Sequence, residues 1–474
     1  MYKAVIGLEV HCELKSNSKN FSSSKNGFSD IPNSNVSVVD LGMPGVLPVV
    51  NKEAVKNSIK MALAMNCTIP KYLTFERKNY FYPDLPKGYQ ITQFKNPIGI
   101  NGYVMIHVNG ADKKVLIHDT HLEEDTASMD HYNGYSLLDY NRCGVPLLET
   151  VTEPCLNSAD EAVAFLEGLR NIFLYTDTSY ARSDKGQIRV DVNVSLMKEE
   201  DTELGTRVEM KNINSFSGVR EAIISEIARQ TEILKNGGKV LQETRRYDEN
   251  TNMTYMMRSK EDAIDYRYFT DPNLPPIKIS SDWVEEIRKE IPKLHNERFS
   301  TYTKDYSINE KDAYTIVRDK NISDFYEECI KLYNNPTIIS NWLTGDVLGN
   351  LNKNSLTINN CKLSPKMLVD LVKMIDDGKI NGKQGKQVLE KMIEEGKEPI
   401  KLVDELGITQ IGSEDEIREI VLSVIDENNN LIEDYKNGKR VFDYFIGQIM
   451  KKTRGRANPV VTSKVLKEEL DKYL

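Results

Sequence analysis

The sequence predicts an α+β protein in which a strand-rich part precedes a part made almost wholly of helices. Up to about residue 290, short segments alternate apolar and polar side chains between Gly and Pro turns. Later segments repeat apolar residues at helical spacing instead. A chain of 474 residues with 39% apolar residues is also too long for one core. We therefore expect three domains, at residues 1–290, 291–405 and 406–474, with boundaries near Ile291-Pro292 and Leu406-Gly407.

Five segments have the pattern of amphipathic helices with start or stop signals. Ser158 and Glu161 form a predicted capping box, and apolar residues follow it at helical spacing as far as Phe173. A second helix is predicted from Gly218 to Leu234, before the Gly237-Gly238 stop. In the later part, helices are expected after the Ser364-Pro365 start, at 417–425 and at 442–450.

Composition limits the class of protein. No apolar stretch approaches the roughly 20 residues of a membrane span, and Glu9 interrupts the apolar start, so we expect a soluble, unexported protein. The six cysteines contain no C-x-x-C pair, which argues against disulfides and thiolate zinc sites and fits a reducing cytoplasm.

Charge is distributed unevenly along the chain. The total is −9, but residues 435–474 hold ten Lys or Arg against four Asp or Glu. This tail therefore carries +6 and the remainder −15. A basic tail can pair with phosphates without reading base sequence, although a charged stretch can also be a merely solvated face.

Three predicted strands carry ionisable side chains on alternate positions. Because a strand turns successive side chains to opposite faces, Glu9 and His11 share one face. The strand 188–195 likewise presents Arg189, Asp191, Asn193 and Ser195, and the strand 207–211 presents Arg207, Glu209 and Lys211. A solvated sheet face is one interpretation; the other is a surface that binds hard cations through carboxylates and phosphates through Arg and Lys.

Polar segments between the strands could complete such a site. They are 121–125, 139–149, 265–268 and the proline-stiffened segment 78–90, and each alone could be an ordinary surface loop. No Walker A, G-x-G-x-x-G or H-E-x-x-H motif is present, so ATP binding here would need a different fold.

These segments resemble the B subunits of the bacterial and organellar Glu/Asp-tRNA amidotransferases. The resemblance rests on motifs that occur in family order along nearly the whole chain: Ile6-Gly-Leu-Glu-Val-His11, Asn79-Tyr-Phe-Tyr-Pro-Asp84, Lys87-Gly-Tyr-Gln90, Leu122-Glu-Glu-Asp125, Asn141-Arg142, Asp191-Val-Asn-Val-Ser195, Glu209-Met-Lys-Asn212, Arg258-Ser-Lys-Glu261, Asp265-Tyr-Arg-Tyr-Phe269 and Gly447-Gln-Ile-Met-Lys451.

The resemblance implies a fold and a set of partners. The expected fold is a cradle with a glutamine-synthetase-like antiparallel sheet, then a helical domain and a small helical tail that contacts tRNA. The expected partners are an amidase subunit that releases ammonia from glutamine, a small third subunit, and misacylated tRNA(Gln) or tRNA(Asn). The implied reaction is ATP-dependent phosphorylation of the Glu or Asp side chain on tRNA, followed by amidation.

Matching positions to the family implies roles for individual residues. Glu9, His11, Glu124 and Glu149 become the metal and catalytic cluster, with Arg189, Asp191 and Glu209 as further catalytic residues. The metal is expected to be Mg²⁺, with Mn²⁺ as the alternative because of His11. Candidates for binding ATP are Arg142, Arg258 and Lys260. The tRNA contacts expected in the tail are Lys436, Lys439, Arg440, Lys451, Lys452, Arg454 and Arg456.

Some positions depart from the family pattern. Thr126-Ala-Ser128 and Ser183-Asp-Lys185 replace residues that are usual in the family, which leaves open a divergent paralogue that binds tRNA as a scaffold without phosphoryl transfer. A metal-dependent enzyme acting on a free small molecule is the other alternative. Zinc-bearing members place cysteines around the positions of Ser22, Ser24, Ser37 and Asp40, so we expect no structural zinc here.

Overall fold

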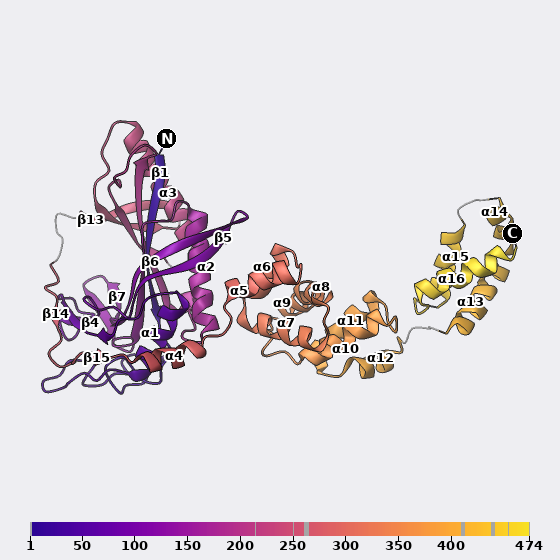
Figure 1. Ribbon diagram of the computed structural model, residues 1–474, viewed down its shortest axis with the longest axis horizontal. Coiled ribbons are helices and arrows are strands. Elements are labelled where there is room, and N and C mark those ends of the chain that lie inside the picture. The colour runs from indigo at the N-terminus through magenta and orange to yellow at the C-terminus, as the bar shows by residue number, and fades with distance from the viewer. Residues whose placement is uncertain are drawn as a thin grey trace. The chain divides into compact units, whose positions relative to one another are not determined.

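The computed structural model describes residues 2–213, 215–249, 251–259, 265–408, 413–437, 441–453 and 455–473. The chain forms two compact units, Met1–Arg298 and Phe299–Leu474 (Figure 1). Within the described residues no helix is long and apolar enough to span a membrane. The domain division predicted at 290/291 and 405/406 stays a prediction.

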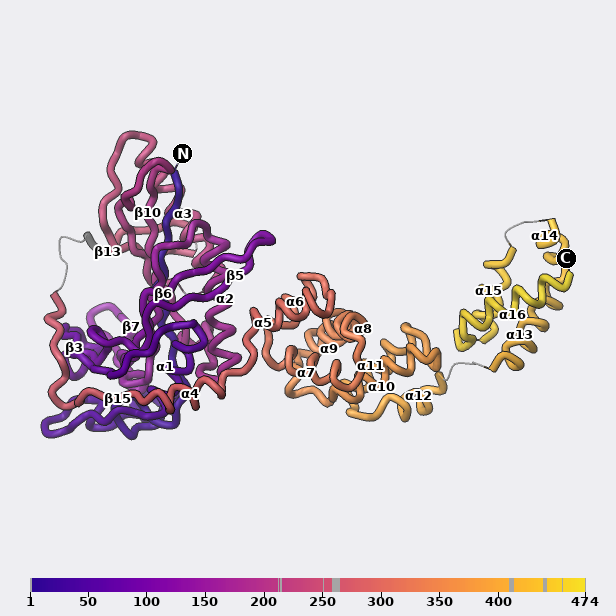
Figure 2. The backbone as a smooth tube through the Cα atoms, viewed as in Figure 1, coloured from indigo at the N-terminus to yellow at the C-terminus, as the bar shows by residue number. Residues whose placement is uncertain are grey.

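The first unit is built on an eight-stranded sheet. Its order is β13-β12-β11-β10-β1-β9-β6-β5, so the N-terminal strand lies in the interior of the sheet (Figure 2). The strands are β1 (Tyr2–Glu13), β5 (Gly99–Val108), β6 (Ala111–Glu124), β9 (Pro146–Thr152), β10 (Ile188–Lys198), β11 (Val208–Ile213), β12 (Glu243–Asp248) and β13 (Met253–Ser259). All neighbours are antiparallel except β11 and β12, which are parallel, so the antiparallel sheet implied by the resemblance is in fact mixed. The α+β class is confirmed.

Alternation in β1 separates the two faces of the sheet. Leu8, Val10 and Cys12 are buried in the core, whereas Glu9 and His11 are only partly buried on the opposite face. The helices α1 (Lys52–Ala64), α2 (Ala159–Tyr175) and α3 (Phe216–Lys235) pack on the apolar side. These three helices therefore do not cover the face that carries Glu9 and His11.

The helix starts show the expected capping residues. The Ser158 side chain accepts a hydrogen bond from the Glu161 amide, and Ser215 accepts one from Gly218. The Glu161 carboxylate reaches the Asn157 amide at 2.7 Å, one residue before the position that a capping box requires. The helix predicted from Gly218 begins slightly earlier, at Phe216, because Ser215 supplies its cap.

Further short strands and helices belong to the first unit. β14 (Phe269–Thr270), β3 (Glu76–Asn79) and β4 (Tyr89–Thr92) form one small sheet, and β7 (Ser128–Tyr132) and β8 (Tyr135–Asp139) form a hairpin. β15 (Ile277–Lys278) pairs with β2 (Tyr72–Leu73), and η1 (Ser183–Lys185), α4 (Ser281–Lys289) and α5 (His295–Ser300) complete the elements. The segment 78–90 thus joins two paired strands.

The second unit is helical throughout its described residues. Its first core, between Tyr302 and Val403, is formed by α6 (Glu310–Val317), α7 (Lys320–Leu332), α8 (Pro336–Asn341), α9 (Leu348–Lys353), α10 (Pro365–Asp376), α11 (Gly382–Glu395), α12 (Pro399–Leu406) and two π-helical turns, η3 (Thr301–Asp305) and η4 (Trp342–Val347). A second core, between Ile417 and Leu470, is formed by α13 (Glu414–Glu427), η5 (Asn429–Leu431), α14 (Ile432–Lys436), α15 (Phe442–Lys452) and α16 (Pro459–Asp471). As predicted, Ser364 caps α10, which begins at Pro365.

Candidate metal and nucleotide site

The polar face of the sheet brings the ends of several strands together around β1. Glu9 lies opposite Asp191 of β10, and His11 lies opposite Arg189 of β10 and Glu149 of β9. Directly opposite residues in antiparallel strands have Cβ atoms about 5 Å apart, so their side chains can meet. Two groups of potential metal ligands result from this register.

The first group consists of His11, Glu123 and Glu149. One ligand atom from each lies within 4.8 Å of the other two, as ligands of a single ion would. The Nδ1 atom of His11 is buried and has no hydrogen-bond partner among the described residues. Glu149 lies 3.9 Å from His11 Nε2 and 3.1 Å from His121 Nε2. The group therefore combines the His11 imidazole, one nitrogen of which has no partner, with two carboxylates.

The electrostatics of this group favour an added cation. Burial, and then the neighbouring Glu149, raise the pKa of Glu123. Burial also opposes ionisation of Glu149, but the charge and hydrogen bond of His121 together with the charges of His11 and Lys78 outweigh it and lower the pKa of Glu149. Burial opposes protonation of His121 as well, but Glu149 and Asp119 outweigh it and raise the pKa of His121. The two glutamates thus repel each other, and a divalent ion between them would relieve that repulsion.

The second group consists of Glu9, Asp191 and Glu209. Their ligand atoms also lie within 4.8 Å of one another, and Asn193 donates to Glu9 at 2.9 Å. Lys211 Nζ lies 2.5 Å from Asp191 and 3.0 Å from Glu209. Burial, and then the charges of Glu149 and Asp191, raise the pKa of Glu9, so the two groups are close enough to interact. Lys211 supplies part of the positive charge that this group needs.

Glu124 lies away from both groups, contrary to the prediction. It is the residue after Glu123 on β6, and successive residues of a strand point to opposite faces. Its carboxylate pairs with Lys87 and accepts the Ile91 amide at 2.9 Å. Glu123, which the sequence analysis did not select, takes the expected place beside His11 and Glu149.

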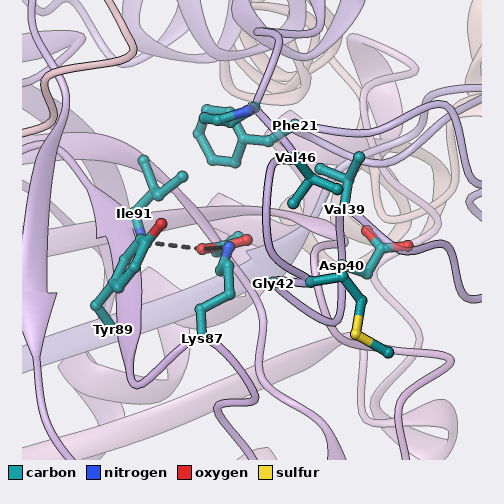
Figure 3. Close-up of a pocket in the computed structure, with 11 residues that line it drawn as sticks. Phe21, Val39, Asp40, Gly42, Val46, Lys87, Tyr89 and Ile91 are labelled. Atoms are coloured by element: carbon teal, nitrogen blue, oxygen red, sulfur yellow. Dashed lines mark hydrogen bonds and ion pairs between the residues drawn. The ribbon is translucent and has the colours of Figure 1, made fainter.

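The Glu124–Lys87 pair borders a cavity of about 100 Å³. Figure 3 shows Lys87 and Tyr89 on one side of it and the segment of Val39, Asp40 and Gly42 on the other. Attraction to Glu124 outweighs burial and raises the pKa of Lys87. This side of β6 therefore holds a buried ion pair next to a small cavity.

The arginines predicted near the site converge on Asp125. Arg189 donates to Asp125 at 2.6 Å, and Arg142 lies 3.4 Å from the same oxygen. Arg142 also donates to the carbonyl groups of Thr126 and Ala127. Arg189 Nε is buried without a partner among the described residues. The Arg258 side chain and Lys260 lie outside the described residues.

Lys78 is a cation near the first group that the sequence analysis did not single out. Burial lowers its pKa, but the charges of Glu123 and then of Tyr268 and Glu149 outweigh this and raise it. Its strand, β3, has only four residues, so alternation gave little signal. Lys78 could stabilise a phosphate held beside His11, Glu123 and Glu149.

The positions around Ser22 and Asp40 form a hydrogen-bonded cluster. Ser22, Ser24 and Ser37 donate their hydroxyl groups to the Asp40 carboxylate at 2.6–3.0 Å. Lys19 lies 3.6 Å from the same carboxylate. Hydroxyl groups and an ammonium are poor ligands for zinc, so this donor set does not suit that ion.

Three of the described lysines that were predicted to contact tRNA lie at the ends of helices. Lys436 ends α14, and Lys451 and Lys452 end α15. Lys452 is paired with Glu427 at 2.5 Å, and Arg456 donates to the Thr453 carbonyl group. Lys439, Arg440 and Arg454 lie outside the described residues.

Comparison with known proteins covers both units. Residues 4–285 match the GatB/GatE catalytic domain, and residues 324–470 match the GatB domain. The B subunits of aspartyl/glutamyl-tRNA(Asn/Gln) amidotransferases are similar over the whole chain. The one from Thermoanaerobacter pseudethanolicus is 47% identical over 473 residues, which cover 99% of this chain and 100% of the relative. Those from Persephonella marina and Brevibacillus brevis are 46% and 45% identical, each over 99% of both chains. The chain therefore belongs to the family of aspartyl/glutamyl-tRNA(Asn/Gln) amidotransferase B subunits.

Proposed function

We propose that this chain activates the side-chain carboxylate of Glu on tRNA(Gln) or Asp on tRNA(Asn) with ATP, so that ammonia converts it to the amide. The observation that carries this proposal is the pair of adjoining ligand groups on one sheet face, His11–Glu123–Glu149 and Glu9–Asp191–Glu209. Family membership supports the same reaction.

The ligand groups suit divalent cations. Carboxylate oxygens are the ligands that Mg²⁺ prefers, and the His11 nitrogen makes Mn²⁺ the alternative in the first group. When bound, such a cation neutralises phosphate oxygens and aligns them for attack. The unpartnered His11 Nδ1 and the repulsion between Glu123 and Glu149 are the features that fit it.

The chemistry must bring two anions together. A carboxylate oxygen of the aminoacyl group attacks the γ-phosphorus of ATP, the bond to the β-phosphate oxygen breaks, and ADP leaves. Ammonia then attacks the activated carbonyl carbon, and inorganic phosphate leaves with the bonding electrons. Lys78 and Arg189 are the cations proposed to stabilise negative charge during these steps.

The partners follow from the same proposal. An amidase subunit supplies ammonia from glutamine, a small third subunit completes a heterotrimer, and the tail contacts tRNA. Lys451 and Lys436 are the described tail cations for which a phosphate contact is proposed.

The deciding experiment replaces one ligand in the assembled complex. With the amidase and third subunits present, Glu149→Gln should lower ATP hydrolysis and amide formation on Glu-tRNA(Gln) by roughly 100-fold or more, because one cation ligand loses its charge. Glutaminase activity of the partner should remain. The matched control is Glu153→Gln, a more exposed carboxylate that pairs with His118 outside both groups.

Other outcomes separate the alternatives. A wild-type complex that binds tRNA but neither hydrolyses ATP nor forms amide would identify a scaffold. A product formed without tRNA would identify an enzyme for small molecules. Full activity of Glu149→Gln would remove the ligand group on which the proposal rests.

A further inference from the structure

Four aromatic side chains gather beside the His11–Glu123–Glu149 group. Phe94 and Tyr268 stack with ring centroids 4.5 Å apart and an angle of 9°. Tyr266 meets Tyr268 edge-on at 6.1 Å and Tyr80 edge-on at 5.8 Å. Phe94 is 61% exposed and Tyr268 36%, so the stacked pair keeps accessible ring surface. Large aromatic side chains are costly to leave in water and commonly mark binding sites.

The backbone holds this aromatic cluster in place. The backbone amide of Phe94 donates a hydrogen bond to the carboxylate of the buried Glu76 at 2.7 Å. On the other segment, Asn79 donates its amide to the Tyr266 carbonyl group at 3.0 Å and its side chain to the Arg267 carbonyl group at 2.9 Å. Arg267 has a φ of 45°, an uncommon conformation for a non-glycine residue. The backbone on both sides of the aromatic cluster is therefore held by hydrogen bonds to β3.

Lys78 connects the aromatic cluster to the ligand group. Its Nζ lies 4.9 Å from the centre of the Tyr266 ring. The charges of Glu123, Tyr268 and Glu149 all act on it. A molecule with a flat ring at one end and phosphate at the other would therefore find ring surface, an ammonium and the carboxylates of a cation-binding group near one another.

We propose that the Phe94–Tyr268 pair stacks a purine base whose phosphate lies toward Lys78 and the His11–Glu123–Glu149 group. This inference rests on the proposed function, which needs an adenosine nucleotide at that group. Two sources have the same chemistry, namely ATP and the 3′-terminal adenosine of the tRNA. Every base offers a π-face to an aromatic ring, and such stacking commonly changes affinity by about ten-fold or more.

The test compares ligands with and without a base. In the complete three-subunit complex, Phe94→Leu combined with Tyr268→Leu keeps apolar volume but removes both rings. Binding of a non-hydrolysable ATP analogue, and of inorganic triphosphate as the base-free probe, is measured by calorimetry with Mn²⁺ present. A second arm measures the affinity of tRNA that ends in CCA and of the same tRNA without its terminal adenosine.

A matched control uses another exposed stacked pair. Tyr132 and Tyr135 on the β7–β8 hairpin have ring centroids 5.1 Å apart and an angle of 14°. Tyr132→Leu with Tyr135→Leu removes the same chemistry elsewhere and should change neither affinity. Unchanged circular dichroism of the Phe94 and Tyr268 double variant shows that it is folded.

The outcomes identify the base or overturn the inference. A roughly ten-fold loss for the ATP analogue, with triphosphate binding intact, assigns the pair to ATP. Loss of the preference for the CCA end, with analogue binding intact, assigns it to tRNA. If neither changes, the aromatic cluster binds no base, whereas loss of triphosphate binding in Glu149→Gln would still support the proposed function.

Discussion

Asp40 is a buried carboxylate that organises the chain between β1 and α1. Its side chain is 4% exposed and accepts three serine hydroxyl groups, and the ammonium of the fully buried Lys19 lies beside it. Burial opposes its ionisation, but the bonds from Ser24 and Ser22 and the charge of Lys19 outweigh this and lower its pKa. The cluster therefore depends on one negative charge.

Removing that charge should destabilise the first unit. Asp40→Asn leaves Lys19 buried without its counter-ion, which typically costs about 3–5 kcal/mol. Guanidinium unfolding followed by circular dichroism measures the loss. The exposed Asp30→Asn is the control, expected within about 0.5 kcal/mol of wild type. Equal stability of the two variants would show that the Asp40 cluster contributes little.

His295 should make the first unit sensitive to acid. Burial lowers its pKa from 6.5 to about 4; the Tyr175 ring packs edge-on at 6.0 Å, and the guanidinium of Arg298 lies 5.2 Å from the same ring. Between these pH values the unfolded chain binds more protons than the folded one, so stability falls as pH falls. From pH 7 to pH 5 this loss is on the order of 2 kcal/mol.

The comparison with His295→Phe isolates this effect. The variant retains an aromatic ring but cannot be protonated, while every other group titrates as before. When the pH is lowered from 7 to 5, the unfolding midpoint should therefore fall less for the variant than for wild type. Parallel losses in both proteins would mean that His295 is not the titrating group.

The residue scale also explains which site residues could be predicted. Alternation in β1 correctly placed Glu9 and His11 on one face, but the register that sets Asp191 of β10 opposite Glu9 was not predicted. The sequence could not decide between the adjacent Glu123 and Glu124, because alternation separates them but does not say which faces His11. That choice is made by the pairing of β6 with β9, in which His121 lies opposite Glu149.

At the scale of elements, a buried ionic network joins α3 to the edge of the sheet. Glu226 on α3 is fully buried and accepts hydrogen bonds from Arg229, Gln230 and Thr254. Arg245 of β12 lies 3.7 Å away. The network thereby ties the helix to both β12 and β13.

Breaking this network should loosen the sheet edge. Glu226→Gln keeps the size of the side chain but removes one of the two carboxylates, Glu226 and Glu243, that neutralise Arg229 and Arg245, at a cost of up to about 3 kcal/mol. Glu232→Gln, on the exposed side of the same helix, should be neutral. Hydrogen exchange should become faster in β12 and β13 of the Glu226→Gln variant but not of the Glu232→Gln variant. Equal exchange in the two variants would show that Glu226 does not hold the sheet edge.

The pairing of β11 with β12 shows what element-level patterns leave undecided. Apolar periodicity predicted α3 and the polar strand before it, but not the direction of the strand after it. β12 runs parallel to β11, and α3 is the crossover between them. The direction of β12 depends on which strand it pairs with after α3, and that pairing is a tertiary contact that local sequence patterns do not determine.

At the scale of the whole molecule, the helical segment that carries the basic tail has its own hydrophobic core between Ile417 and Leu470. A chain segment with its own hydrophobic core can be removed without exposing the hydrophobic cores of the other segments. Deletion of residues 406–474 should therefore weaken tRNA binding while the first unit stays folded.

The dependence on salt measures the tail's contribution. Each phosphate contact that is lost should reduce the slope of log affinity against log salt by roughly one. Lys451→Ala should reduce this slope more than Lys452→Ala, because Lys452 is already paired with Glu427. Unchanged affinity of the deletion variant at moderate salt would remove the tail from the tRNA contacts.

The neighbouring glutamates of β6 limit how this region can change in evolution. Glu123 serves one side of the sheet and Glu124 the other, and β6 is held between β9 and β5. A deletion of one residue just before them would change the surroundings of both acids at once, because it would place Glu124 beside His11 and Asp125 at the partner position of Lys87. Substitutions here can therefore be tested one at a time by selection, but a change in length cannot.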